Sequence, residues 1–157
     1  MENLLYAVPV IGVVSLVVAL VLKSWIGKQD EGNDRMKEIS GYIREGAMAF
    51  LGREYKMVAA FAVALLLIVA IFISPIAAIA CLFGAAFSVL AGYIGMKTAT
   101  DANVRTTNAA SKGGMPSALK VAFRGGAVMG LCVVGLGLLD IAIWWIILNA
   151  FVDIEGT

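Results

Sequence analysis

The fold of this chain is decided by residues 76–110, IAAIACLFGAAFSVLAGYIGMKTATDANVRTTNAA. An apolar span from Ile76 to Met96 continues, without a helix breaker, into a polar stretch that begins at Lys97 and ends at Ala110. We expect one long helix, half in lipid and half in water, because the polar half cannot be accommodated in hydrocarbon. The boundary near Lys97 then marks one surface of the membrane.

Small residues recur every four positions along two rows of this predicted helix. One row is Gly84, Ser88 and Gly92, and the other is Ala91, Gly95 and Ala99. Rows of small residues let the backbones of neighbouring helices approach closely inside a membrane. We therefore expect other helices to pack along this one.

The composition excludes an ordinary soluble domain. Of the 157 residues, 61% are hydrophobic and 15% are charged, and the mean hydropathy is +0.93. These values are typical of an integral membrane protein. The chain has no His, which removes the commonest transition-metal ligand and the commonest neutral-pH proton carrier. Cys81 and Cys132 both lie in apolar spans, so we expect small buried hydrophobes rather than a disulfide or a metal pair.

Four apolar stretches predict an all-α membrane protein with four transmembrane helices, at about residues 4–22, 57–73, 76–96 and 127–148. Each is close to the ~20 residues that cross a ~30 Å hydrocarbon core at about 1.5 Å per residue. We expect one membrane domain over residues 1–157. Ser74 and Pro75 leave room only for a tight antiparallel reversal between the second and third spans. Residues 111–116, SKGGMP, predict a turn before the fourth span.

The segment from residue 23 to residue 56 has the pattern of an amphipathic helix. Its apolar positions recur at three and four residues: Met36, Ile39, Ile43, Ala47 and Phe50. Asn33 or Asp34 is the expected N-cap. Glycines at positions 41, 46 and 52 could interrupt the pattern, so both one bent helix and two separate helices fit.

Positive charge is confined to two segments. All 12 Lys and Arg residues lie in residues 23–56 and 97–124. Four spans place both segments on one side of the membrane, and the excess of basic residues identifies that side as cytoplasmic. The N-terminus, the hairpin at Ser74 and the C-terminus are then expected outside. The first span is expected to remain as an anchor, because no basic segment precedes it and no small-residue cleavage site follows it.

Asp140 is the acidic residue in the middle of the predicted fourth span. An ionisable group at that depth costs about 2.5–3.5 kcal/mol on insertion scales unless it finds a partner or a water-filled cavity. At about 100° per residue, it shares a helix face with Gly126, Gly130 and Gly137, which we expect to pack on protein. Two roles fit: an ion or proton site, or a protonated or hydrogen-bonded side chain that joins two helices. We favour the second.

The basic residues Lys97, Arg105 and Lys112, with the pair Gly113 and Gly114, could suggest a phosphate cradle. The strand, loop and helix arrangement of a P-loop is absent, as is the Ser or Thr after a Gly-Lys pair. Charge that anchors the chain at the cytoplasmic surface explains these residues adequately. From the residues alone we predict no enzyme.

Three long stretches nevertheless resemble the N-terminal part of the membrane-bound, ion-pumping pyrophosphatases. They are RMKEISGYIREGA at residues 35–47, GYIGMKTATDANVRT at residues 92–106 and ALKVAFRGGAVMGL at residues 118–131. The resemblance covers essentially the whole chain in order. It implies a homodimer of sixteen-helix bundles, with both ends outside, in the cell membrane. It also implies hydrolysis of inorganic pyrophosphate with Mg²⁺, and with K⁺ or Na⁺ as further cations, coupled to export of H⁺ or Na⁺.

The chain departs from that family in length. The family's Asp-rich pyrophosphate and magnesium motifs and its ion gate lie on later helices, so we assign no catalytic, substrate-binding or metal residue here. The chain resembles the first four helices, the first quarter of the bundle, and is expected to be inactive alone. Asp140 is left as the single candidate intramembrane polar residue, and no nucleic acid partner is expected.

Two other functions fit the residues. A proteolipid ring subunit of a rotary ion-driven motor also has a glycine-rich helix and one carboxylate in the membrane. The long charged segment of residues 23–56 argues against it, because such subunits have short polar loops. A structural four-helix membrane protein is the third interpretation.

Overall fold

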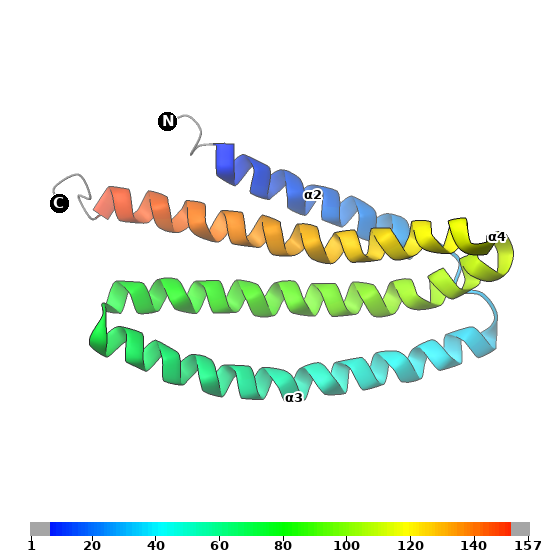
Figure 1. The fold of residues 1–157 in the computed structure, drawn as a ribbon, viewed down its shortest axis with the longest axis horizontal. Helices are drawn as coiled ribbons and strands as arrows, with labels where there is room; N and C mark the ends of the chain where they lie inside the picture. Colours follow the sequence, from blue (N-terminus) through cyan, green and yellow to red (C-terminus); the bar gives the residue numbers. More distant parts are fainter. Residues whose placement is uncertain (1–6, 152–157) are drawn as a thin grey trace.

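The computed structural model describes residues 7–151, and every regular element in that range is a helix. The three helices are α2 (Ala7–Gly27), α3 (Asp34–Phe72) and α4 (Pro75–Phe151). They form long rods that run alongside one another (Figure 1). Within the described range all three are long and apolar enough to cross a membrane. The prediction of an all-α protein with apolar helices is confirmed.

Helix α2 contains most of the predicted first span; residues 4–6 of that span lie outside the described residues. The helix continues five residues past position 22 and ends at Gly27. No breaker stops it earlier, and Pro9 lies in its first turn, where the missing N–H does least harm.

Helix α3 is one continuous helix, which decides between the two arrangements that fitted its sequence. Asn33 is the N-cap, and its side-chain oxygen accepts a hydrogen bond from the Met36 amide at 2.9 Å. The glycines at 41, 46 and 52 do not break the helix, because each costs only about 1 kcal/mol relative to Ala and good helix formers surround them. At the other end, the Ile73 and Ser74 amides both donate to the Val69 carbonyl at 3.0 Å. The predicted hairpin at Ser74 and Pro75 is confirmed.

Helix α4 corrects the expected number of helices, because the third and fourth predicted spans belong to one element. The structure therefore has three helices in its described range rather than four. Gly114, with φ 67° and ψ −167°, is the only residue of α4 with a non-helical backbone. A residue with a side chain rarely adopts this conformation, whereas Gly does so at little cost. Helical bonding resumes directly after it, so the predicted turn at residues 111–116 is a bend at one residue.

The two parts of α4 lie antiparallel on either side of that bend (Figure 1). We call residues 75–113 the first arm and residues 115–151 the second arm. Going outward from the bend, Gly125 faces Ala102 and Gly95 faces Met129; further out, Gly84 faces Asp140. The long helix predicted for residues 76–110 is confirmed as the first arm, and it passes from apolar to polar without a break.

Helix α2 packs against both arms. Ala19 and Ile26 of α2 are buried with Ala102 of the first arm and with Val128 and Cys132 of the second arm. Cys132 is a free, buried cysteine and Cys81 is free and half-buried, as expected for small hydrophobes. Helix α3 packs on α4 through fewer buried side chains, and Leu51 is its one buried residue.

The close packing predicted along the small-residue rows of the first arm is confirmed, because a Cβ atom on Gly95 would lie 2.6 Å from Met129 and one on Gly92 would lie 3.3 Å from Tyr55. A further close contact joins α2 to the second arm. A Cβ atom on Gly135 would lie 2.8 Å from the Leu16 side chain and 2.9 Å from the Gly12 carbonyl oxygen. By contrast, Gly126, Gly130 and Gly137 are exposed, with open space where a Cβ would be. Within residues 7–151, this second set therefore meets no other helix, and its packing on protein stays a prediction. The sequence spacing predicts the angles between the glycines around the helix axis. It does not predict how the helix is rotated about that axis relative to its neighbours.

We predict that Gly135→Ala destabilises the protein, whereas Gly137→Ala is neutral or slightly stabilising. Both changes add a residue with better helix propensity, worth about 1 kcal/mol. Only the methyl group at 135 would push α2 away from α4, an overpacking cost of about 1–3 kcal/mol. The measurement is unfolding of the purified protein in mixed micelles, followed by circular dichroism. Equal effects of the two substitutions would contradict the packing described here.

Candidate functional site

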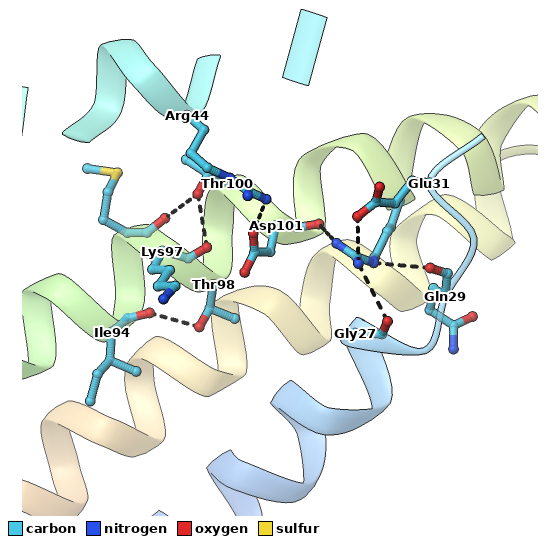
Figure 2. A network of polar contacts seen from close by, with 11 residues as sticks. Gly27, Gln29, Glu31, Arg44, Ile94, Lys97, Thr98, Thr100 and Asp101 are labelled. Carbon is cyan, nitrogen blue, oxygen red and sulfur yellow. Dashed lines mark hydrogen bonds and ion pairs between the residues drawn. The ribbon is translucent and has the colours of Figure 1, made fainter. Parts of the chain in front are cut away.

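A network of charged and polar side chains lies where α2 ends and α3 begins (Figure 2). We call it the Arg105 cluster. Its side chains come from the loop between α2 and α3, from α3 and from the first arm of α4: Asp30, Glu31, Arg44, Asp101, Arg105, Asn108 and Lys112. Four of these lie at positions 101, 105, 108 and 112, a spacing that places them on one face of a helix.

Arg105 is the centre of this cluster and is only 9% exposed. Its Nε donates to the Gln29 carbonyl at 3.1 Å and its Nη1 to the Asp101 carbonyl at 2.6 Å. Its Nη2 donates to Glu31 Oε1 at 2.8 Å and to the Gly27 carbonyl at 3.5 Å. The last carbonyls of a helix have no partner within the helix, and this end of the helix dipole is negative. The guanidinium therefore caps α2 and neutralises the acidic loop that follows it.

Asn108 and Lys112 hold the next part of the loop. Asn108 Nδ2 donates to the Asp30 carbonyl at 2.9 Å, and the Lys112 ammonium pairs with the Asp30 carboxylate. The Asp30 carboxylate also accepts from the Gly32 amide at 2.9 Å. These contacts favour the charged carboxylate, and they lower the pKa of Asp30 to about 2, with the hydrogen bond from Lys112 as the largest cause.

The cluster also joins α3 to α4, because Arg44 of α3 forms an ion pair with Asp101 of the first arm. Nearby, Thr98 and Thr100 are buried, and their hydroxyls donate back to carbonyls of their own helix, Thr98 to Ile94 at 2.8 Å. The buried hydroxyls therefore have hydrogen-bond partners within α4 itself.

The residues weighed as a phosphate cradle do not lie together as one. Arg105 and Lys112 already bind oxygens of this chain, Lys97 is exposed, and Gly113 and Gly114 lie at the bend of α4. Sequence reasoning did not foresee that Arg105 would cap α2. The available signal was the spacing of polar residues in the first arm, together with the acidic pair at Asp30 and Glu31.

Asp140 lies in the second arm, half-buried beside Gly84 of the first arm. A Cβ on Gly84 would lie 3.2 Å from Asp140 Oδ2. The carboxylate borders a cavity of about 180 Å³, which Ser88 also lines. Among residues 7–151, the buried Asp140 Oδ1 and Trp144 Nε1 have no hydrogen-bond partner. The ring of Trp144 contacts Phe83 edge-on, with 5.9 Å between centroids.

Comparison with known proteins gives this arrangement its context. Residues 13–156 match the family described as inorganic H⁺ pyrophosphatase. The chain belongs to that family. A relative from Clostridium tetani, named a putative K(+)-stimulated pyrophosphate-energized sodium pump, is 48% identical over 83% of this chain and 19% of its own length.

Relatives named as sodium pumps and relatives named as proton pumps match this chain about equally well. A K(+)-insensitive pyrophosphate-energized proton pump from Methanosarcina mazei is 47% identical over 88% of this chain and 21% of its own length. A K(+)-stimulated pyrophosphate-energized sodium pump from Thermotoga maritima is 45% identical over 76% of this chain and 17% of its own length. The chain therefore spans about a fifth of the length of these relatives. The resemblance to pyrophosphate-energised pumps is confirmed, and it decides against a proteolipid ring subunit.

The family implies Mg²⁺, and the described residues do not fit a magnesium site. Magnesium in proteins is held by carboxylate oxygens, water and phosphate. Within residues 7–151, no three His, Cys, Asp or Glu side chains are grouped so that they could hold a metal ion. The acidic residues of the Arg105 cluster are instead paired with basic ones. No step proposed below depends on a metal bound by this chain.

We predict that Arg105→Met destabilises the protein by about 2–3 kcal/mol, because Glu31 and three carbonyls lose a charged donor. The C-terminal end of α2 should detach from α4. Trypsin should therefore cleave after Lys28 faster in the variant than in the unchanged protein. Arg53→Met is the matched control, since Arg53 is exposed and makes no hydrogen bond or ion pair within the described range. Similar cleavage rates in both variants would show that Arg105 does not hold α2.

Proposed function

We propose that this chain is the N-terminal membrane segment of a pyrophosphate-energised cation pump. The pump would couple hydrolysis of inorganic pyrophosphate to transport of H⁺ or Na⁺ across the cell membrane. The observation that carries this proposal is the family match through residues 13–156 in a chain about a fifth as long as its relatives. Relatives named for proton and for sodium pumping both match, so the proposal covers both ions.

In this proposal the segment is a scaffold rather than a catalytic part. The pyrophosphate and Mg²⁺ ligands would lie in the part of the pump beyond this chain, and the whole pump would work as a homodimer. Support comes from the way the polar residues of this segment are used. Arg44, Arg105 and Lys112 bind the chain's own carboxylates, which fixes α2, α3 and α4 relative to one another.

We also propose that the chain crosses the membrane four times, with each arm of α4 crossing once. The N-terminus, the reversal at Ser74 and the C-terminus would lie outside. The bend at Gly114 and the Arg105 cluster would lie in the cytoplasm. Support comes from the antiparallel arms and from the confinement of Lys and Arg to two segments at one end of the helices.

The topology is tested with single cysteines in a protein whose Cys81 and Cys132 have been changed to Ala. Met115→Cys, next to the bend, should be shielded from an impermeant thiol reagent added to intact cells. Ile73→Cys, at the opposite end, should be labelled. Both native side chains are at least 70% exposed, so access within the protein is matched. The opposite labelling pattern would refute the orientation.

The function is tested with a chimera in which this chain replaces the corresponding part of the Clostridium tetani relative. We expect the chimera to hydrolyse pyrophosphate and to load inverted vesicles with a cation, because the two sequences are 48% identical over the shared region. The chain alone should release no phosphate from magnesium pyrophosphate above a detergent blank.

The same chimera carrying Arg105→Met serves as the control for assembly, because it should lose activity together with stable expression. A chimera that inserts and assembles but does not hydrolyse pyrophosphate would contradict the proposed function. Hydrolysis by the isolated chain would contradict the proposal that the active site lies beyond it.

Asp140 is proposed as a side chain that joins helices rather than as a site on the ion path. Its unpaired oxygen and the nearby Trp144 N–H would find partners on another helix of the pump. In the active chimera, Asp140→Asn should preserve hydrolysis and transport, while Asp140→Leu should weaken assembly. Loss of transport in an Asp140→Asn protein that assembles and hydrolyses normally would place Asp140 on the ion path.

A further inference from the structure

An apolar groove of about 260 Å³ runs along α2 and ends at a lysine. Ala19 of α2 and Val128 and Cys132 of the second arm form its buried floor. Leu20 of α2 and Leu90 of the first arm form its rim, and they are 65% and 44% exposed. The groove is therefore open on one side. Because its walls belong to apolar spans, that side would lie within the membrane rather than in water.

Lys23 is the charged residue of this groove, and it lies at the end where α2 leaves the apolar span. It is half-buried and makes no hydrogen bond or ion pair with any residue in the range 7–151. Arg44, Arg105 and Lys112 are all paired with carboxylates in the same structure. A half-buried ammonium without a partner is costly, so an anion at this end of the groove would be favoured.

A second positive charge lies at the same end of the groove. Arg124 of the second arm is one helical turn from Val128, on the side of the bend. Its guanidinium stacks over the Trp25 ring at 3.8 Å from the centroid, which holds it against α2. Tryptophan and basic side chains at the end of a span are typical of the level of lipid head groups.

We propose that this groove binds an anionic phospholipid of the leaflet on the side of the Arg105 cluster. One acyl chain lies along the floor, and the phosphate head group contacts Lys23. From Leu16 to Lys23 the groove extends along α2 for about 10 Å at ~1.5 Å per residue, which suits the part of a chain nearest the head group. Basic pockets between transmembrane helices bind anionic head groups for the same electrostatic reason.

A phospholipid fits this groove better than another helix does. A helix is about 10–12 Å across, so it could place only single side chains in the groove. An apolar helix face would also leave the Lys23 ammonium without an anion. An anionic phospholipid supplies both the apolar chain and the negative charge, and it lacks the cationic choline that would weaken the attraction.

The proposal is tested by native mass spectrometry of the intact chain, released from detergent with added phosphatidylglycerol or phosphatidylcholine of identical acyl chains. We expect about fivefold preferential retention of phosphatidylglycerol. Lys23→Gln should abolish the preference, and Lys23→Arg should keep it. Lys120→Gln is the matched control, because Lys120 is exposed and lies outside the groove. A preference that persists in Lys23→Gln, or that is lost equally in Lys120→Gln, would refute the site.

The acyl-chain part of the proposal has its own test. Leu20→Trp places a large side chain at the rim and should lower retention of both phospholipids at least threefold. Val17→Trp changes a similarly exposed residue of α2 outside the groove and should have no effect. Unchanged retention in Leu20→Trp would show that the lipid binds elsewhere. Displacement of phosphatidylglycerol by equimolar oleate would identify a free fatty acid, rather than a phospholipid, as the occupant.

Discussion

The arrangement of the helices depends on the Arg105 guanidinium and the oxygens around it. Arg105 lies in the polar half of the first arm of α4, and its distant partners are the last carbonyl of α2, at Gly27, and the loop that follows, at Gln29 and Glu31. Because a guanidinium offers five N–H donors in one plane, one side chain can hold a helix end and a carboxylate together. Without it, the loop would carry negative charge at the negative end of a helix dipole.

The second constraint is the distance between backbones inside the membrane. Lipid offers no hydrophobic force that drives apolar helices together, so tight contact depends on small residues. Gly12 and Gly135 bring α2 and the second arm together, and Gly125 brings the two arms together near the bend. The Arg105 cluster holds the helices together at one end of the bundle. These glycines hold them close together along the apolar part. Helix α3 has one buried residue and relies more on its connections at the two ends.

Most of the helical architecture could be predicted from the sequence, because it depends on local interactions. Hydropathy located the apolar parts of all three helices, Asn33 was a recognisable N-cap, and Ser74 with Pro75 allowed only a reversal. The candidate site was predicted less well. Asp140 was singled out by its charge within an apolar span, but the role of Arg105 was missed. Its partners at Gly27, Gln29 and Glu31 lie 74 to 78 positions away in the chain, and no local pattern specifies such a pairing.

By itself, the sequence determined that this is an all-α membrane protein of the pyrophosphate-energised pump family, since composition and long sequence matches need no coordinates. Only the tertiary structure decided that α4 bends at a single residue, Gly114, and that Gly135 rather than Gly137 meets α2. The physical reason is rotational. An apolar helix can turn about its axis with little change in hydrophobic energy, so its orientation is set by close contacts and buried charges contributed by distant segments.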